Sequence, residues 1–229
     1  MRLYLRRWTH HAIILSALTI GLIFAAVLSA CKNHSTGPSS KVGEMVQPTP
    51  IVIPVSDGFD YPFGKVNLHN RAKEKVGWYD AQDFGVNDHL GEDWNTKTGG
   101  NTDCGLPVYA AAKGTIVFAD NAGPGWGNVL IVRHRLPDGR LIETLYGHLQ
   151  SFAKTSGDVN RREVVGNIGD GGGAYLCHLH FELRLANCPS WGQPGAGYSS
   201  DKTGWTQPSD FINANRAFKD SQIGSGSSR

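Results

Sequence analysis

Short runs of apolar residues, separated by turn-forming residues, follow one another along most of the chain after residue 57. Four of these runs are rich in the β-branched and aromatic residues that are typical of strands. Stretches such as Gly123-Pro124-Gly125 and Pro137-Asp138-Gly139 lie between them and favour turns. The runs cover residues 107–118, 128–133, 141–146 and 164–168. This pattern predicts a mainly β domain built on an antiparallel sheet.

Two of these runs, 128–133 and 141–146, are predicted to form a hairpin because Pro-Asp-Gly lies between them. A helical pattern occurs near the C-terminus, at residues 208–218. The 29 glycines favour tight turns over long helices, and a chain of 229 residues with 40% hydrophobic content can bury one good-sized core. We therefore expect one domain at residues 57–219 and a flexible tail at 220–229.

The first 30 residues follow a different pattern. A basic start, Arg2 to Arg7, precedes an almost wholly apolar segment at 12–28, and Leu28-Ser29-Ala30-Cys31 closes it. This order is typical of a secretory signal, and small residues directly before a cysteine resemble a bacterial lipobox. A plain transmembrane anchor is the alternative. We expect residues 1–30 to be a signal peptide and Cys31 to be lipidated, which anchors the protein to a membrane of the cell envelope.

Residues 31–56 carry Ser-Thr-Gly-Pro-Ser-Ser and Pro-Thr-Pro and are expected to form a flexible tether. Without Arg2, Arg6 and Arg7, 19 of the 22 basic residues remain against 20 acidic residues, so the mature chain has a net charge of −1. A neutral domain gives no electrostatic support for nucleic-acid binding. The domain is therefore expected to act in the envelope, at the end of its tether.

The stretch Cys177-His-Leu-His-Phe-Glu-Leu-Arg-Leu185 places two histidines one residue apart in a predicted strand. Since side chains alternate along a strand, His178 and His180 share one face. A histidine and a carboxylate four residues apart, His89 and Asp93, flank Gly91. Catalytic zinc sites use three His, Asp or Glu ligands and leave a fourth position for water. His89, Asp93 and one histidine of the pair can supply such a set.

His148 ends another predicted strand, in Tyr146-Gly-His-Leu149. Together with the remaining histidine of the 178/180 pair, it can orient a zinc-bound water and transfer protons. These three motifs resemble the signatures of the lysostaphin-type (LytM-like) zinc metallopeptidases. Further matches lie between them, at residues 105–111, 125–128, 157–159 and 166–169, and the similarity runs in order from about Phe59 to Ala217.

The resemblance implies that His89, Asp93 and His180 bind Zn2+ and that His148 and His178 are the catalytic pair. It implies a β-sheet scaffold of the LytM-like (duplicated hybrid motif) kind with a short C-terminal helix, and cleavage of peptide bonds in bacterial peptidoglycan. The bond is either a D,D-cross-link or one inside a glycine bridge. The resemblance leaves open which histidine is the general base. A tyrosine often helps to stabilise the oxyanion in this family, and Tyr79 is a candidate.

Other polar and aromatic residues have an ordinary structural interpretation beside a functional one. Glu182 shares the face of His180 and either supports that ligand or is simply structural. Glu92 should point away from Asp93. Core packing is the expected role of Trp94, whereas Trp126 can line a groove. His69 and His134 match no motif and are expected to be structural or to lie on the surface.

Three cysteines, Cys104, Cys177 and Cys188, follow the expected lipidation site. Export favours one disulfide with one cysteine left over. A straight strand from Cys177 to Leu185 spans about 26 Å at about 3.3 Å per residue, so three more residues cannot return Cys188 to Cys177. The pairings 104–177 and 104–188 remain open.

Two other functional classes compete with the peptidase. One is a non-catalytic relative that activates other cell-wall hydrolases, but such proteins typically lack some of the five site residues that are all present here. The other is a zinc-binding or zinc-storing lipoprotein, which would favour four closed protein ligands over three with an open position. Protein partners, by contrast, leave no recognisable signal in the sequence.

Overall fold

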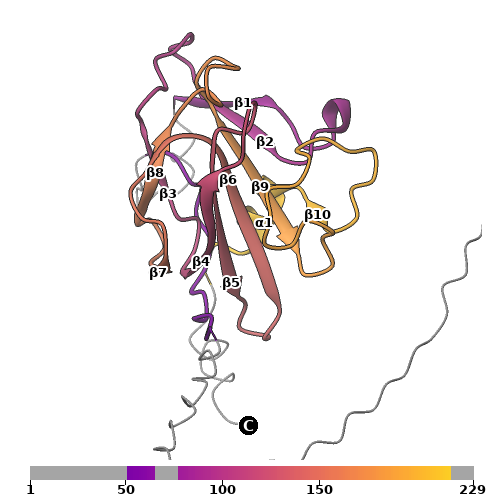
Figure 1. The fold of residues 1–229 in the computed structure, drawn as a ribbon. Coiled ribbons are helices and arrows are strands. Elements are labelled where there is room, and N and C mark those ends of the chain that lie inside the picture. The colour runs from indigo at the N-terminus through magenta and orange to yellow at the C-terminus, as the bar shows by residue number, and fades with distance from the viewer. Residues whose placement is uncertain (1–50, 65–76, 218–229) are drawn as a thin grey trace, which may run out of the picture. The chain divides into compact units, whose positions relative to one another are not determined.

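The computed structural model describes residues 51–64 and 77–217, all within one compact unit, Thr49–Arg229. The described residues form an antiparallel sheet whose main path has the order β1-β2-β9-β6-β5-β4-β7 (Figure 1). Beside this path, β10 pairs with β9, and β8 pairs with both β3 and β6. The elements are β1 (Trp78–Gln82), β2 (Glu92–Thr96), β3 (Pro107–Tyr109), β4 (Gly114–Asn121), β5 (Asn128–Arg135), β6 (Leu141–Phe152), β7 (Gly157–Val159), β8 (Val164–Ile168), β9 (Leu179–Leu185), β10 (Trp205–Thr206) and α1 (Pro208–Ala214).

The expected antiparallel β architecture is confirmed, including the β5–β6 hairpin across Pro137-Asp138-Gly139. Gly139 has a φ of 89°, which explains why a glycine closes this turn. The run expected at 107–118 is divided into β3 and β4. The helix is shorter than expected and ends at Ala214, because Asn215 leaves the helical conformation. The hydrophobic pattern did not predict strand β2, because its sequence, EDWNT, is mostly polar.

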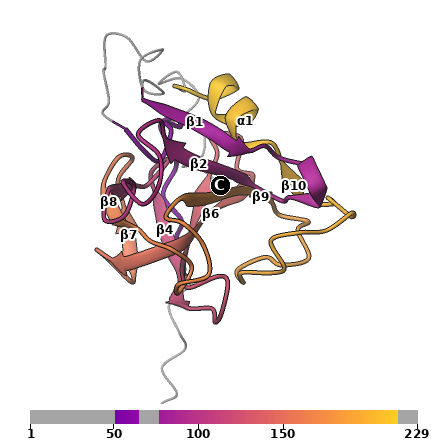
Figure 2. The same ribbon diagram turned by 90° about the horizontal axis from the view of Figure 1, so that it is seen from above.

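Strand β9 separates the core from the face that carries the predicted site. Its apolar side chains, Leu179, Phe181 and Leu183, belong to the main hydrophobic core together with Ile212 of α1. Its polar side chains, which alternate with them, point to the other side of the sheet. In the view from above, α1 and the loop that follows β9 lie on opposite sides of β2 and β9 (Figure 2). The alternation predicted for the 177–185 stretch therefore positions the site outside the core.

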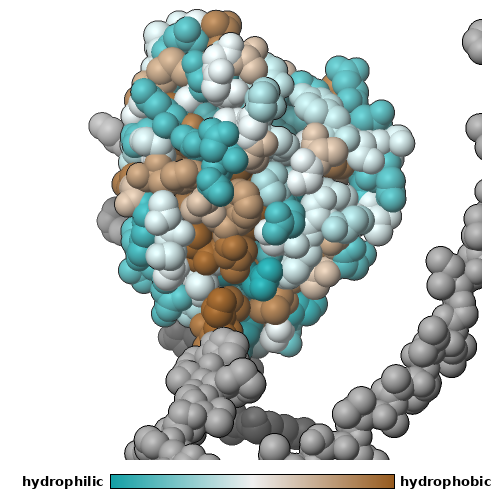
Figure 3. All heavy atoms as spheres, in the orientation of Figure 1, coloured by the Kyte–Doolittle hydropathy of each residue, from teal (hydrophilic) through white to brown (hydrophobic). Residues whose placement is uncertain are grey.

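The N-terminal part of the described chain contacts the sheet before residue 57, the start expected for the domain. Val55 forms a parallel bridge with Arg135, and the Ser56 hydroxyl donates to the Lys113 carbonyl. Hydrophilic residues cover much of the face shown in Figure 3, and hydrophobic residues gather in its lower half, where β4 and β5 lie. Among the described residues, no helix is long and apolar enough to cross a membrane.

Candidate metal centre

Asp93 and His180 are brought together by the pairing of β2 with β9. The register of this antiparallel pair places the two residues opposite each other, and opposed residues project on the same side of a sheet. His180 Nδ1 lies 3.0 Å from Asp93 Oδ1. Both side chains are buried. The contact therefore follows directly from the strand register.

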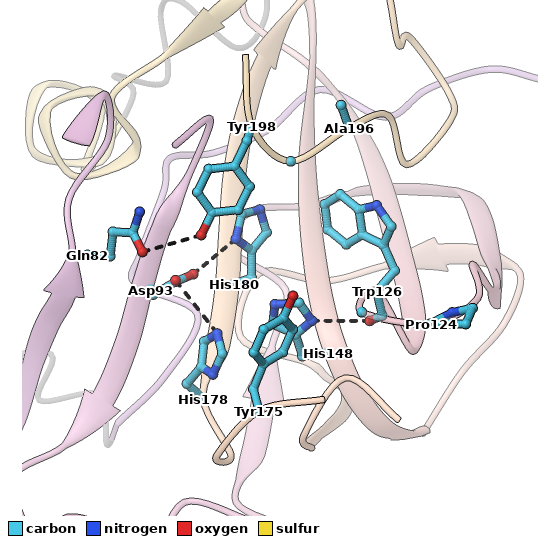
Figure 4. A pocket seen from close by; sticks show the side chains of 12 residues that line it. Gln82, Asp93, Pro124, Trp126, His148, Tyr175, His178, His180, Ala196 and Tyr198 are labelled. Atoms are coloured by element: carbon cyan, nitrogen blue, oxygen red, sulfur yellow. Dashed lines mark hydrogen bonds and ion pairs between the residues drawn. The ribbon is translucent and has the colours of Figure 1, made fainter. Parts of the chain in front are cut away.

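His89 completes a group of three potential ligands. It follows a 3₁₀ turn, Val86–Asp88, and its fully buried ring places Nε2 2.9 Å from His180 Nδ1 and 3.3 Å from Asp93 Oδ1. One ligand atom from each of the three residues lies within 4.8 Å of the other two. Two imidazole nitrogens and a carboxylate oxygen are typical donors of a zinc site that keeps a position for water. Figure 4 shows Asp93 and His180 converging on one side of the pocket.

Glu182 determines which nitrogen of His180 faces this group. Its Oε1 lies 3.0 Å from His180 Nε2, and its Oε2 accepts hydrogen bonds from Arg184 Nε (2.7 Å) and Trp205 Nε1 (2.8 Å). Because an ionised carboxylate can only accept, His180 donates from Nε2, so that Nδ1 is the nitrogen whose lone pair points toward Asp93 and His89 once a metal ion replaces its proton. Of the two interpretations of Glu182, this geometry favours the one in which Glu182 orients His180, a potential metal ligand.

The electrostatics of His89, Asp93 and His180 favour a positive charge between them. Burial opposes ionisation of His180, but its hydrogen bonds to Asp93 and Glu182 raise its pKa to about 9. Burial likewise opposes ionisation of Asp93, but hydrogen bonds and charges from His180 and His89 bring its pKa well below the usual range. His89 Nε2, His180 Nδ1 and an Asp93 oxygen thus lie close together with a carboxylate among them. A cation between these three atoms, in place of the proton on His180, would be bound by all of them, so the residues present fit a zinc ion.

His148 is directed into the same space by an irregularity in β6. Between Tyr146 and Leu149 this strand has one residue more than its partner β5, and His148 adopts a φ of 60°. Its Nδ1 donates to the Trp126 carbonyl at 3.2 Å, so the neutral ring exposes Nε2 as an acceptor. Burial, and then the charges of His180 and His178, lowers its pKa to about 3. The ring is therefore neutral at neutral pH.

His178 lies immediately before β9, in an isolated bridge with Gly169. Its Nδ1 donates to the Leu176 carbonyl at 2.8 Å, and its Nε2 lies 3.7 Å from Asp93 Oδ2. The ring centroids of His148 and His178 are 4.7 Å apart. The two histidines thus stand side by side next to Asp93 and His180 (Figure 4).

A pocket of about 360 Å³ opens beside these residues, with aromatic side chains from three loops on its walls. Trp126 comes from the β4–β5 loop, Tyr175 from the β8–β9 loop and Tyr198 from the β9–β10 loop. Tyr79 does not line this pocket, because the β1–β2 register places Gln82, rather than Tyr79, opposite Asp93. The sequence identifies Trp126 as a candidate groove residue, whereas no sequence motif indicates Tyr175 or Tyr198.

Gly147 provides room for the Trp126 ring in the wall of the pocket. It lies opposite His180 in the β6–β9 pair, and a Cβ there would be 3.0 Å from Trp126 Cζ3 and 3.3 Å from His180 Cβ. Most side chains avoid such short contacts. The glycine of the Tyr146-Gly-His-Leu149 motif therefore allows the Trp126 ring to pack against the site.

The neighbouring polar residues take structural positions. Glu92 points away from Asp93, as expected, and its carboxylate accepts hydrogen bonds from the backbone N–H and hydroxyl of Ser209 at the start of α1. Trp94 is buried in the core. His134 is fully buried, where its Nδ1 donates to the Lys113 carbonyl and its Nε2 lies 2.8 Å from Thr144 Oγ1.

The disulfide joins Cys104 to Cys177, one of the two pairings left open by the sequence, and Cys188 is a buried free thiol. The bridge holds the residue that precedes His178. Several expectations concern residues outside the described ones: Cys31, the signal peptide, the tether as far as residue 50, His69 and the tail at 220–229.

Comparison with protein families matches residues 87–190 to the model described as Peptidase family M23. This span includes all five predicted site residues. Over 85 residues, 37% of this chain, the sequence is 40% identical to the DD-carboxypeptidase/endopeptidase Mpg of Neisseria meningitidis serogroup B, and the matched part is 19% of that protein. The chain therefore spans about a fifth of the length of this relative.

A second relative is covered more completely. The lipoprotein NlpD of Yersinia enterocolitica is 32% identical over 81 residues, which are 35% of this chain and 78% of NlpD. Among solved structures, the antimicrobial peptidase lysostaphin from Staphylococcus simulans matches with a TM-score of 0.41 and 21% identity, over 75% of this chain and 52% of that one.

Proposed function

The chain belongs to peptidase family M23, and from this premise we propose that it is a zinc-dependent endopeptidase that hydrolyses peptide cross-links of bacterial peptidoglycan. The observation that carries the proposal is the convergence of His89, Asp93 and His180, with His148 and His178 beside them. Except for His89, these residues line one pocket. A storage site would not need two further histidines next to its ligands.

In this proposal His89 Nε2, His180 Nδ1 and an Asp93 oxygen hold the metal. A zinc ion bound there would supply Lewis acidity, which would polarise the scissile carbonyl and make a water molecule more acidic. His180 is kept in the required orientation by Glu182. Asp93 and His180 are supplied by two paired strands, and His89, itself buried, follows the exposed 3₁₀ turn at Val86–Asp88.

His148 and His178 are proposed to manage the protons. Each ring donates its Nδ1 hydrogen to a backbone carbonyl, of Trp126 and Leu176 respectively, so each neutral ring presents Nε2 to the reaction. One Nε2 would accept a proton from the attacking water. This proton would pass by way of the second ring to the leaving amine as the C–N bond breaks, so that both rings end neutral. Because both rings present Nε2 in the same way, these contacts do not assign the two roles, and the identity of the general base stays open.

The substrate is proposed to be the peptide cross-link of the producing cell's own wall. Lipidation at Cys31 and the tether before the sheet contact at Val55 would keep the domain near the wall, where proximity raises the effective concentration of the substrate. Cleavage of a D,D-cross-link is the first expectation, and cleavage within glycine bridges is the alternative. Replacement Cys31→Ser should abolish labelling of the protein by a radioactive fatty acid; undiminished labelling would refute the proposed anchor.

The test is the fate of purified cross-linked dimeric muropeptides, followed by mass spectrometry. The proposal expects conversion to monomers, loss of conversion on adding a chelator and recovery on adding zinc. Persistent dimers together with cleavage of a glycine peptide would shift the specificity to the alternative. Inertness toward both substrates in a protein that holds zinc would instead support a non-catalytic activator.

A further inference from the structure

The polar face of β9 continues beyond the metal ligand. His180, Glu182 and Arg184 alternate along the strand on the side away from the core, and all three are buried. Glu182 accepts hydrogen bonds from both neighbours: from His180 through Oε1, and from Arg184 through Oε2. An unbroken line of contacts therefore runs from the metal ligand to Arg184.

Arg184 uses its remaining donors to hold the β9–β10 loop, residues 186–204. Its Nη1 donates to the carbonyl of Ser190 at 3.0 Å and to that of Gln193, and its Nη2 donates to the carbonyl of Pro194. The side chains of Arg184 and Glu182 are both fully buried. A buried guanidinium with a carboxylate on one side and three carbonyls on the other cannot move without leaving charges or polar groups unsatisfied.

The part of the loop that Arg184 holds leads directly into the wall of the pocket. The Gly195 carbonyl accepts a hydrogen bond from Trp126 Nε1 at 3.0 Å, and Ala196, Gly197 and Tyr198 line the pocket. The Tyr198 ring lies 5.0 Å from the ring of His89. The same guanidinium therefore fixes the support of one metal ligand and the approach to the substrate groove.

We propose that Arg184 is a positioning residue that couples the orientation of His180 to the position of the 193–198 segment. This inference rests on the proposed function, since it concerns how that site is held. Arginine is required because its planar fork can donate to Glu182 and to several carbonyls at once, whereas the lysine ammonium is a single point donor. Coupling is reciprocal: metal binding should restrain the loop, and disturbing the loop should weaken metal binding.

The molecule offers a matched control in Arg133. This residue pairs with Glu143, with 2.6 Å between Nη2 and Oε1, and Glu143 Oε2 accepts a hydrogen bond from the Gly192 N–H. Its guanidinium also lies 4.8 Å from the centroid of the Trp191 ring. Arg133 thus anchors the same loop, but through Glu143 instead of the carboxylate that binds His180.

The experiment compares Arg184→Lys with Arg133→Lys in the full chain. The first readout is the zinc dissociation constant, measured by competition with a chromogenic chelator, and the second is amide hydrogen exchange of residues 193–199 with and without zinc. We expect Arg184→Lys to bind zinc on the order of 10- to 100-fold more weakly and to lose the protection that zinc gives to the loop. Arg133→Lys should change the zinc dissociation constant by no more than about threefold and should keep the zinc-dependent protection of the loop. Loss of a residue that supports a metal ligand costs about tenfold or more in metal affinity.

Equal effects of the two substitutions on zinc affinity, or no effect of either, would overturn the coupling. If Arg184→Lys does not fold, Glu182→Gln carries the same test. The amide of the new glutamine can still accept a hydrogen bond from His180, but it turns a donor toward Arg184. Unchanged zinc affinity and unchanged loop exchange in Glu182→Gln would overturn the proposed coupling. A wild-type chain that binds no zinc would contradict the proposed function itself, so the two failures are distinguishable.

Discussion

Asp93 on β2 and His180 on β9 are register partners, and 3.0 Å separates their facing side-chain atoms, Oδ1 and Nδ1. Because side chains alternate along a strand, a slip of one residue between these strands would turn one of the pair into the core. The relative position of these two proposed ligands is therefore as well defined as the sheet, and changes that preserve the β2–β9 register should leave it in place.

Replacement Gly147→Ala should lower activity while zinc remains bound. The added methyl group would lie 3.0 Å from Trp126, so the ring that lines the pocket must shift by a few tenths of an ångström. We expect kcat/KM on muropeptide dimers to fall on the order of 10- to 100-fold, and overpacking to cost about 1–3 kcal/mol of unfolding free energy. The control Gly139→Ala, at an exposed turn with a φ of 89° and no heavy atom near the new methyl group, should lose stability without losing activity. Unchanged kinetics of Gly147→Ala would show that the position of Trp126 does not matter.

His134 should make the domain less stable in acid. Burial lowers its pKa from 6.5 to about 4, so the unfolded chain takes up a proton in this range before the folded chain does. The stabilisation is fully present above pH 6.5 and is lost as the pH falls toward 4, by about 3 kcal/mol. Urea unfolding between pH 7 and 4 should show a steeper loss for the wild type than for His134→Gln. Parallel curves would mean that other groups cause the acid sensitivity.

Reduction of the Cys104–Cys177 disulfide should impair both stability and catalysis. The bridge spans 73 residues and precedes His178 directly. Its loss is expected to cost about 2–4 kcal/mol, and activity should fall while zinc stays bound, since His178 is not among the three converging ligand atoms. The control Cys188→Ser should respond to reductant like the wild type, whereas Cys104→Ser should not respond. Alkylation of Cys177 or Cys104 in the oxidised, denatured chain would refute this pairing.

The alternation of side chains along strands explains how much of this architecture could be predicted from the sequence. It placed His178 and His180 on one face and Glu92 away from Asp93, and the Pro-Asp-Gly turn gave the β5–β6 hairpin. The position of β2 was not recognisable, because its polar sequence hides a strand buried between β1 and β9.

The walls of the pocket could not be predicted in the same way. Tyr175 and Tyr198 belong to loops whose paths depend on distant anchors, such as the carbonyl groups held by Arg184 and the disulfide at Cys177. The contribution of His148 depends on a bulge and a φ of 60°, which no periodic pattern indicates. Tyr79 was a reasonable candidate by residue type, and only the β1–β2 register separates it from Asp93.

The most direct test of the site is the zinc content per chain of three purified variants, measured by elemental analysis next to their activity on muropeptide dimers. We predict that Asp93→Ala and His180→Ala lose both zinc and activity, because each removes one donor of a three-ligand site. His178→Ala should keep one zinc per chain and lose about a hundredfold or more in rate, as expected when a proton-transfer group is removed. Full zinc content in Asp93→Ala and His180→Ala would contradict the assignment of the metal centre.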